Sequence, residues 1–166
     1  MEEEEIIIKK YSAEYKDEII DLILDIQQNE FQIPIKKEDQ PDLNDIPNFY
    51  QALHGNFWMA ICNNRVVGTI SLRDIGNKQG ALRKMFVKAA YRGSSYNIGK
   101  LLLLNLIHWA REHYIQEIYL GTTEKFLAAH RFYEKNGFVQ IAKADLPDAF
   151  PIMKVDSRFY RLYIKE

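Results

Sequence analysis

The feature that most constrains the fold is a change of pattern after residue 88. Three short β-type segments precede it, close together along the chain, at residues 57–62, 66–73 and 81–88. The tight turn Asn63-Asn64 and a looser turn at 76–80 separate them, so the three segments are expected to form an antiparallel meander. A polar loop at 92–97 then precedes a strongly apolar helical segment at 98–113, and from there on predicted helices alternate with predicted strands.

The rest of the chain supplies the other elements. A β-branched run at 6–8 predicts a first strand, and Ser12 is expected to cap a helix that continues to about residue 28. Three prolines exclude one long helix over residues 29–50, where a loop and a short helix near 49–53 are expected. Later elements are expected as a strand at 117–121, a helix capped by Thr122 or Thr123 and stopped at Asn136-Gly137, and strands at 138–142 and 159–164. This order predicts an α/β fold, with a mixed, mostly antiparallel central sheet flanked by helices, in a single domain over residues 1–166.

Composition excludes several classes of protein. Of the 166 residues, 47% are hydrophobic, which is enough for a folded core. The formal net charge is -1, so the chain has no global field that would attract a nucleic acid. Cys62 is the single cysteine, and no apolar stretch reaches the ~20 residues that span a bilayer. With its acidic N-terminus, the chain is expected to be cytoplasmic, with no membrane and no nucleic-acid partner.

The loop at 91–100 is the first candidate for a binding site. It places small residues between a strand and a helix N-terminus, where backbone N–H groups and the helix dipole favour an anion such as a pyrophosphate. A glycine-rich turn with no binding role explains the same residues. Two nucleotide-binding motifs are excluded. The P-loop of NTP-binding proteins needs four residues before Gly-Lys and a Ser or Thr after it, but five residues separate Gly93 from Gly99-Lys100, and Leu101 follows. The dinucleotide-binding fingerprint G-x-G-x-x-G is absent.

Two blocks of sequence resemble the GNAT superfamily of N-acetyltransferases. The cofactor loop of that family has the pattern Q/R-x-x-G-x-G/A, which residues 94–99 follow with Ser94 at the first position and Asn97 at the first glycine. Asparagine tolerates a left-handed backbone well, so this loop can still form. Residues 128–138, AAHRFYEKNGF, are similar to the family's A-x-x-F-Y-E-K-x-G-F block. The resemblance implies a GNAT-like fold whose splayed strand pair holds acetyl-CoA, and direct transfer of the acetyl group to a primary amine.

The resemblance also implies site residues. The expected cofactor-binding residues are Phe86, Val87, Arg92, Gly93, Ser94, Ser95, Tyr96, Asn97, Ile98, Gly99, Lys100 and Phe126. A backbone N–H near Phe86 or Val87 would polarise the thioester carbonyl. Phe126 stands where many members have asparagine, and the strand before the loop lacks the glutamate by which several members activate the amine. Tyr133 is expected to donate a proton to the leaving CoA thiolate. By helical spacing alone, Tyr133 is a core aromatic.

The general base and the acceptor are left open. Glu30, His54, Asp74 and Asp156 are candidate bases by predicted position, although each is also explained as a surface or capping residue. No His, Cys or carboxylate cluster has metal-ligand spacing, so no metal is expected. The two segments expected to flank the acceptor are acidic, with five acids against two bases at 29–50 and three against one at 145–157. A cationic acceptor is therefore predicted, a small amine or a peptide, although exposed loops are often acidic.

Two other functions fit parts of the sequence. The first is a non-catalytic acyl-CoA-binding or regulatory module on the same fold. The second is a nucleic-acid-binding module that uses Arg83, Lys84, Lys88 and Arg92, residues that phosphate contacts to CoA or a solvated strand face explain better. The chain is expected to be a monomer or a homodimer.

Overall fold

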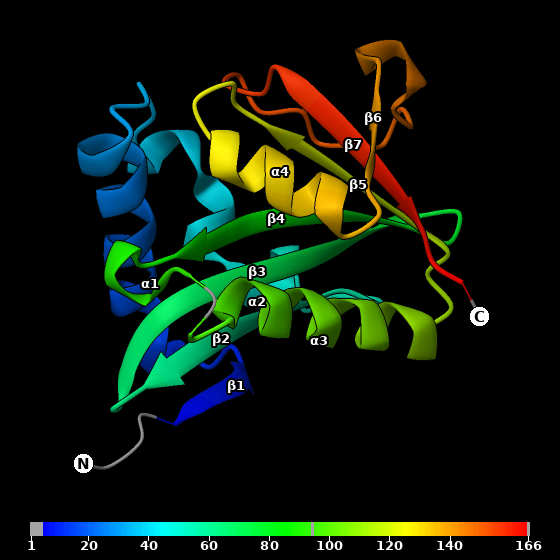
Figure 1. Ribbon diagram of the computed structural model, residues 1–166. Coiled ribbons are helices and arrows are strands. Elements are labelled where there is room, and N and C mark those ends of the chain that lie inside the picture. Colours follow the sequence, from blue (N-terminus) through cyan, green and yellow to red (C-terminus); the bar gives the residue numbers. More distant parts are fainter. Residues whose placement is uncertain (1–4, 94, 166) are drawn as a thin grey trace.

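The computed structural model describes residues 5–93 and 95–165, and these are built around one seven-stranded sheet (Figure 1). The strands are β1 (Ile6–Lys10), β2 (Asn56–Cys62), β3 (Arg65–Gly76), β4 (Gln79–Val87), β5 (Glu117–Thr122), β6 (Val139–Ile141) and β7 (Arg158–Tyr163). Their order across the sheet is β1-β2-β3-β4-β5-β7-β6, and all neighbours are antiparallel except β4 and β5. The predicted fold class and the β2-β3-β4 meander are confirmed.

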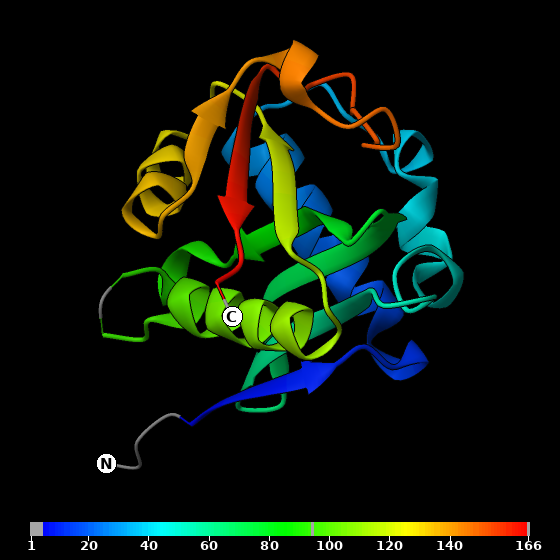
Figure 2. The same cartoon turned by 90° about the vertical axis from the view of Figure 1, so that its right-hand side faces the viewer.

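The helices flank this sheet (Figures 1 and 2). They are α1 (Lys16–Leu24), α2 (Ile46–Phe49), α3 (Ile98–Glu112) and α4 (Leu127–Lys135), and one π-helical segment, Asp25–Glu30, continues α1. The short helix expected near 49–53 lies earlier, at Ile46–Phe49. Among the described residues, none of the helices has the length and apolarity needed to cross a membrane.

Two predicted helix caps are wrong. Ser12 makes no side-chain capping bond, because its hydroxyl donates to the Glu14 carboxylate instead (3.2 Å), and α1 begins after a 3-10 turn. Neither Thr122 nor Thr123 caps α4, because β5 extends through Thr122 and the helix begins at Leu127. The predicted stop is confirmed: Gly137, just after α4, has a φ of +93°, in the left-handed region that glycine tolerates.

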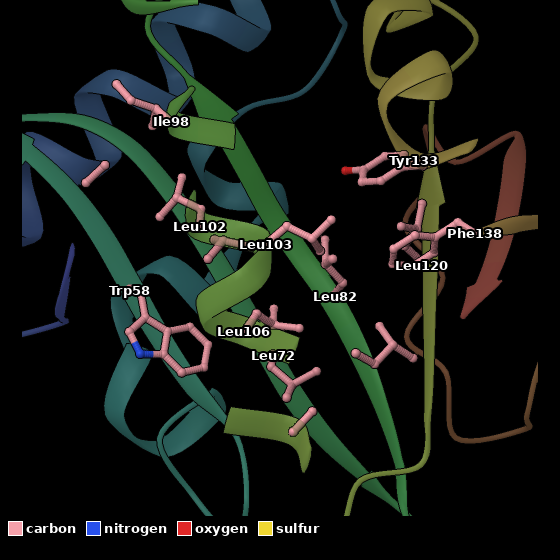
Figure 3. Packing of buried hydrophobic residues seen from close by; sticks show 14 of the residues in the cluster. Trp58, Leu72, Leu82, Ile98, Leu102, Leu103, Leu106, Leu120, Tyr133 and Phe138 are labelled. Atoms are coloured by element: carbon pink, nitrogen blue, oxygen red, sulfur yellow. The ribbon is translucent and has the colours of Figure 1, made fainter. Parts of the chain in front are cut away.

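Strand β2 divides the interior into two cores. It is buried along its whole length, so both faces of the sheet are covered at this strand. Because successive side chains of a strand point to opposite faces, alternate residues enter different cores. Trp58, Ala60 and Cys62 pack in the core below α3 (Figure 3), whereas Phe57, Met59 and Ile61 pack in the core below α1.

Strands β4 and β5 separate, and this separation positions the site. They pair only at Gln79↔Glu117, Gly80↔Ile118 and Ala81↔Tyr119. Beyond these pairs a bulge follows in β4, where one extra residue lies between the partners of Thr69 and Ser71 on β3. Two β3 hydroxyls donate to the β4 carbonyls at the bulge, Thr69 to Lys84 (2.7 Å) and Ser71 to Arg83 (2.6 Å). Lys84 itself has a φ of +51°, which is uncommon for a residue other than glycine.

Candidate active site

A cavity of about 530 Å³ opens where β4 and β5 part. Residues 82–87 of β4 form one wall, residues 120–122 of β5 form the other, and α4 lines it from the side. The loop before α3 lies at one end, and residues 150–156 lie at the other. This volume is typical of a small-molecule site, and two stretches of strand edge without a sheet partner border it.

The loop end is built from backbone. Gly93 has a φ of +115° and Asn97 a φ of +56°, so the left-handed conformation expected at Asn97 is present. The chain enters α3 there, and the first N–H groups of a helix have no partners within it. A Cβ added at Gly99 would make ordinary van der Waals contacts, with Phe132 at 3.5 Å and Met85 at 3.6 Å. The N–H groups that are unpaired at this helix start are suited to the pyrophosphate of a CoA molecule.

Most of the predicted cofactor residues line this cavity. They are Phe86, Val87, Arg92, Gly93, Asn97, Ile98, Gly99, Lys100 and Phe126. Two others do not: Ser95 is exposed, and Tyr96 packs against Tyr91 with ring centres 5.1 Å apart. Ser94 lies outside the described residues. The contact of all three with a cofactor stays a prediction. Phe126 lies between two other aromatic rings, Phe31 at 4.8 Å and Phe86 at 6.1 Å.

One backbone N–H of β4 faces the open edge. The N–H of Lys88 donates to the Val67 carbonyl of β3 (2.8 Å). In an extended chain the N–H groups of neighbouring residues point to opposite sides, so the N–H of Val87 lies toward the edge that β5 leaves open. Of the two positions considered from sequence, Val87 is thus the one with a donor available in the cavity.

Tyr133 brings a hydroxyl into the cavity from α4. Its ring is buried against Phe138 and Tyr160, and its hydroxyl oxygen points away from Phe138 toward β4 (Figure 3). The hydroxyl donates to the sulfur of Met85 (3.6 Å), which is a weak acceptor. Burial raises the pKa of Tyr133, so the side chain stays protonated at neutral pH. The ring is part of the core and the hydroxyl serves the cavity, so the two interpretations of this residue are compatible.

Three of the four candidate bases lie elsewhere. Glu30 pairs with both terminal nitrogens of Arg92, one of them at 2.8 Å. His54 and Asp74 hydrogen-bond to each other (3.1 Å), and neither lines the cavity. Asp156 alone of the four faces the cavity, and burial raises the pKa of its carboxyl group. Its carboxylate lies directly against Gly121 of β5, so a Cβ at that glycine would approach it to 2.7 Å.

A buried polar network lies behind Arg83 and Lys84, which line the other end of the cavity. Tyr50 donates to Asp42 (2.5 Å) and accepts from Nε of Arg83 (3.0 Å), while Nζ of Lys84 lies 3.6 Å from the same Asp42 oxygen. The interpretation of Lys84 as part of a solvated strand face is therefore wrong, whereas a phosphate contact by either residue stays a prediction. In a regular strand these neighbours would point to opposite faces, but the bulge brings both to one acidic group.

Sequence reasoning missed Asp42 and Tyr50. Both come from the proline-containing segment 34–50, and nothing in its pattern marks them as buried. Two adjacent charges in a central strand, Arg83 and Lys84, were the available signal, because both faces of such a strand are covered. Within residues 5–93 and 95–165, no group of three or more His, Cys, Asp and Glu side chains is placed to hold a metal ion.

Comparison with known proteins agrees with this geometry. The family model described as Acetyltransferase (GNAT) family matches residues 20–138, which include both sequence blocks and the two splayed strands. The chain belongs to the GNAT acetyltransferase family. A solved GNAT acetyltransferase from Staphylococcus aureus Mu50 is 47% identical, with a TM-score of 0.94 over 97% of this chain and all of that one.

More distant relatives share part of the chain or only the GNAT fold. N-acetylaspartate synthetase of Xenopus tropicalis is 36% identical over 104 residues, or 60% of this chain. The aligned part is 37% of that relative, so the chain spans little more than a third of its length. The PaiA N-acetyltransferase of Thermoplasma acidophilum, solved in complex with coenzyme A, is 20% identical with a TM-score of 0.75, covering 96% of this chain and 99% of that one.

Proposed function

We propose that this protein is an acetyl-CoA-dependent N-acetyltransferase that moves the acetyl group directly to a primary amine. The observation that carries the proposal is the single cavity between β4 and β5, which combines an anion-binding helix start, a strand N–H and the Tyr133 hydroxyl. The cofactor would lie along β4, with its pyrophosphate at residues 93–99 and its pantetheine arm beside Phe126.

Two groups of the cavity would serve the reaction at the thioester. The amine nitrogen attacks the thioester carbon, and the N–H of Val87 stabilises the negative charge that grows on the carbonyl oxygen. As the C–N bond forms and the C–S bond breaks, Tyr133 gives its proton to the leaving sulfur. The attacking nitrogen loses one proton and the phenolate of Tyr133 recovers one, so a neutral amine and acetyl-CoA give an amide and a thiol with no net proton. An acceptor that enters as an ammonium ion releases one further proton before it attacks. No metal takes part in this scheme.

The test is a thiol-release assay over a broad panel of primary amines, with acetyl-CoA binding measured in parallel by thermal shift. An enzyme releases thiol faster in the presence of at least one amine. Aspartate belongs in the panel, because relatives are named N-acetylaspartate synthetase. A protein that acetyl-CoA stabilises but that releases no thiol with any amine is instead the non-catalytic acyl-CoA-binding module. Other acyl-CoA donors tested in the same assay define the range of the acyl group.

A further inference from the structure

The charges around the end of the cavity opposite the α3 loop are balanced. Two cations, Arg83 and Lys84, and the Asp156 carboxylate line this end, and the Asp42 carboxylate lies behind Lys84, outside the cavity lining. Of the six other acidic residues in these segments, none lines the cavity, and four are bound locally. Asp39 and Asp145 accept backbone N–H groups within their own turns, Asp45 binds Asn48, and Glu30 binds Arg92. The acidic excess of the two segments therefore does not reach the cavity, so it gives no net attraction for a cation there.

Lys84 has donors left over. Its side chain is 2% exposed, yet its ammonium group lies 3.6 Å from Asp42 and 3.5 Å from the sulfur of Met153, which is a weak acceptor. An ammonium group has three N–H donors, and burying them without good acceptors is costly. Asp42 is itself already bound by the Tyr50 hydroxyl. A further anionic oxygen placed in the cavity would complete the environment of Lys84.

Arg83 stands between this cavity and a second one. The second cavity, of about 300 Å³, lies between residues 34–42 and residues 151–155, and Arg83, Met153 and Val155 line both. The Arg83 guanidinium donates to Tyr50 and to the Pro151 carbonyl (2.8 Å), which uses two of its five donors. The Arg83 side chain therefore borders both cavities, whereas Lys84 lines only the first. The small volume of the second cavity suits a single small molecule.

Asp156 offers the opposite charge across from these cations. One oxygen of its carboxylate accepts the N–H of Met153 (2.9 Å) and lies against Gly121, at the point where β5 turns away from β4. Burial raises the pKa of Asp156, and a less acidic carboxyl group is a stronger base for an ammonium proton. The site thus places positive groups, Arg83 and Lys84, apart from a negative group, Asp156, while its net charge is balanced.

From this arrangement, and resting on the proposed function, we infer that the acceptor is a small zwitterion, an amino acid or similar amino-carboxylate. Lys84 and Arg83 bind its carboxylate, and Asp156 binds its ammonium group and accepts the proton that the amine must lose before it attacks. The neutral amine then forms the C–N bond, and the C–S bond breaks as described above. A cationic centre is present in such an acceptor, as predicted from the sequence, but a carboxylate accompanies it.

The experiment compares matched amines in the thiol-release assay. Each of the twenty L-amino acids is measured, and every one that is acetylated is compared with its amide and its decarboxylated amine; spermidine and a lysine-rich peptide complete the panel. The expected result is a kcat/KM at least about tenfold higher for the amino acid than for its amide, from the lost charged hydrogen bonds. Spermidine or the peptide as the best substrate would overturn the zwitterion and leave the N-acetyltransferase intact. If no amine in the panel increases the release of thiol, the proposed function itself is overturned.

Two substitutions test the roles of Lys84 and Asp156 separately. Lys84→Met should raise KM for the amino acid about tenfold and leave kcat/KM for the amide within about twofold, so the preference for the carboxylate disappears. Asp156→Asn should lower kcat for the amino acid and its amide alike. Lys78→Met, an exposed lysine at the tip of the β3-β4 hairpin, is the matched control. If Lys84→Met does not fold, the double variant Lys84→Met/Asp42→Asn removes both charges. It should show the same loss of preference for the amino acid over its amide in kcat/KM. A carboxylate preference that survives in these variants would overturn the assignment.

Discussion

The two ends of the cavity are built in different ways. The loop end comes from one continuous segment, residues 91–100, and it works through backbone N–H groups that a left-handed turn directs into the cavity. The far end is assembled from side chains of segments far apart along the chain: Arg83, Lys84 and Asp156 line it, and Asp42 lies behind Lys84. The comparison teaches that one end of the cavity is fixed by a local motif and the other by long-range packing. Under the proposed function, the motif would hold the cofactor and the packed side chains would hold the acceptor.

The largest expected effect is at the loop end. Gly99→Glu should abolish measurable acetyl-CoA binding, because the side chain would place a carboxylate beside the position of the pyrophosphate. Isothermal titration with acetyl-CoA measures this. Gly99→Ala is the matched control, since its Cβ would make only ordinary contacts at 3.5 Å and beyond. Retained affinity in Gly99→Glu would mean that the pyrophosphate binds elsewhere.

Removal of the Tyr133 hydroxyl should have the next largest effect. Tyr133→Phe is expected to lower kcat by about 10² or more, with acetyl-CoA affinity unchanged, because general acid catalysis contributes in that range. Steady-state kinetics and titration of the cofactor measure the two quantities. Tyr160→Phe removes a hydroxyl at similar depth that donates to Glu134 (2.6 Å) outside the cavity, and it should keep kcat. Equal kcat in Tyr133→Phe and the wild type would remove the proton-donor role.

At the side-chain end, Tyr50→Phe should reduce stability. The hydroxyl of Tyr50 links Asp42 to Arg83 inside the protein, so its loss leaves two charged groups with fewer partners. The expected drop in the free energy of unfolding is about 1–3 kcal/mol, measured by urea denaturation. Tyr114→Phe, on a side chain that is 77% exposed, should change it by less than about 0.5 kcal/mol. The same small change in Tyr50→Phe would show that the network adds little to folding.

The same end should make the stability of the protein depend on pH. Burial lowers the pKa of Lys84 from 10.5 to about 8. Between these values the unfolded chain holds a proton that the folded chain has released, so the free energy of unfolding rises with pH. Denaturation at pH 7.5 and 9.5 should show a larger increase in the wild type than in Lys84→Met. The comparison stops below pH 10, because the raised pKa values of buried tyrosines such as Tyr133 act in the opposite direction there. An equal increase in both proteins would contradict the expected shift.

The smallest expected effect concerns Asn97. Glycine at this position should change acetyl-CoA affinity by less than about threefold, because it adopts the same left-handed backbone without strain. Asn97→Ala should cost about 1 kcal/mol of stability, since alanine is disfavoured there. Thermal unfolding and cofactor titration of both variants measure the difference. A strong loss of affinity in Asn97→Gly would show that the asparagine side chain, rather than its backbone, serves the cofactor.

The sequence predicted most of the fold for physical reasons that are local. Apolar periodicity and turn residues place the β2-β3-β4 meander and α3 to within a few residues. The helix caps were wrong, because Ser12 and Thr122 had other uses that only the folded chain reveals. Most cofactor residues could be predicted, since they occupy one motif. The roles of Arg83 and Lys84 could not, because they depend on a bulge and on Asp42, some forty residues away in the chain.

The short pairing of β4 with β5 has a consequence for cooperativity. Only three residue pairs join these strands, so the sheet consists of two parts that share little backbone hydrogen bonding. Segments with so few connections can open separately, and amide exchange in β5 and β7 can then run faster than in β2 and β3. A ligand bound between β4 and β5 stabilises only the state in which both walls are formed. Binding of the first substrate would thus join the two parts into one unfolding unit.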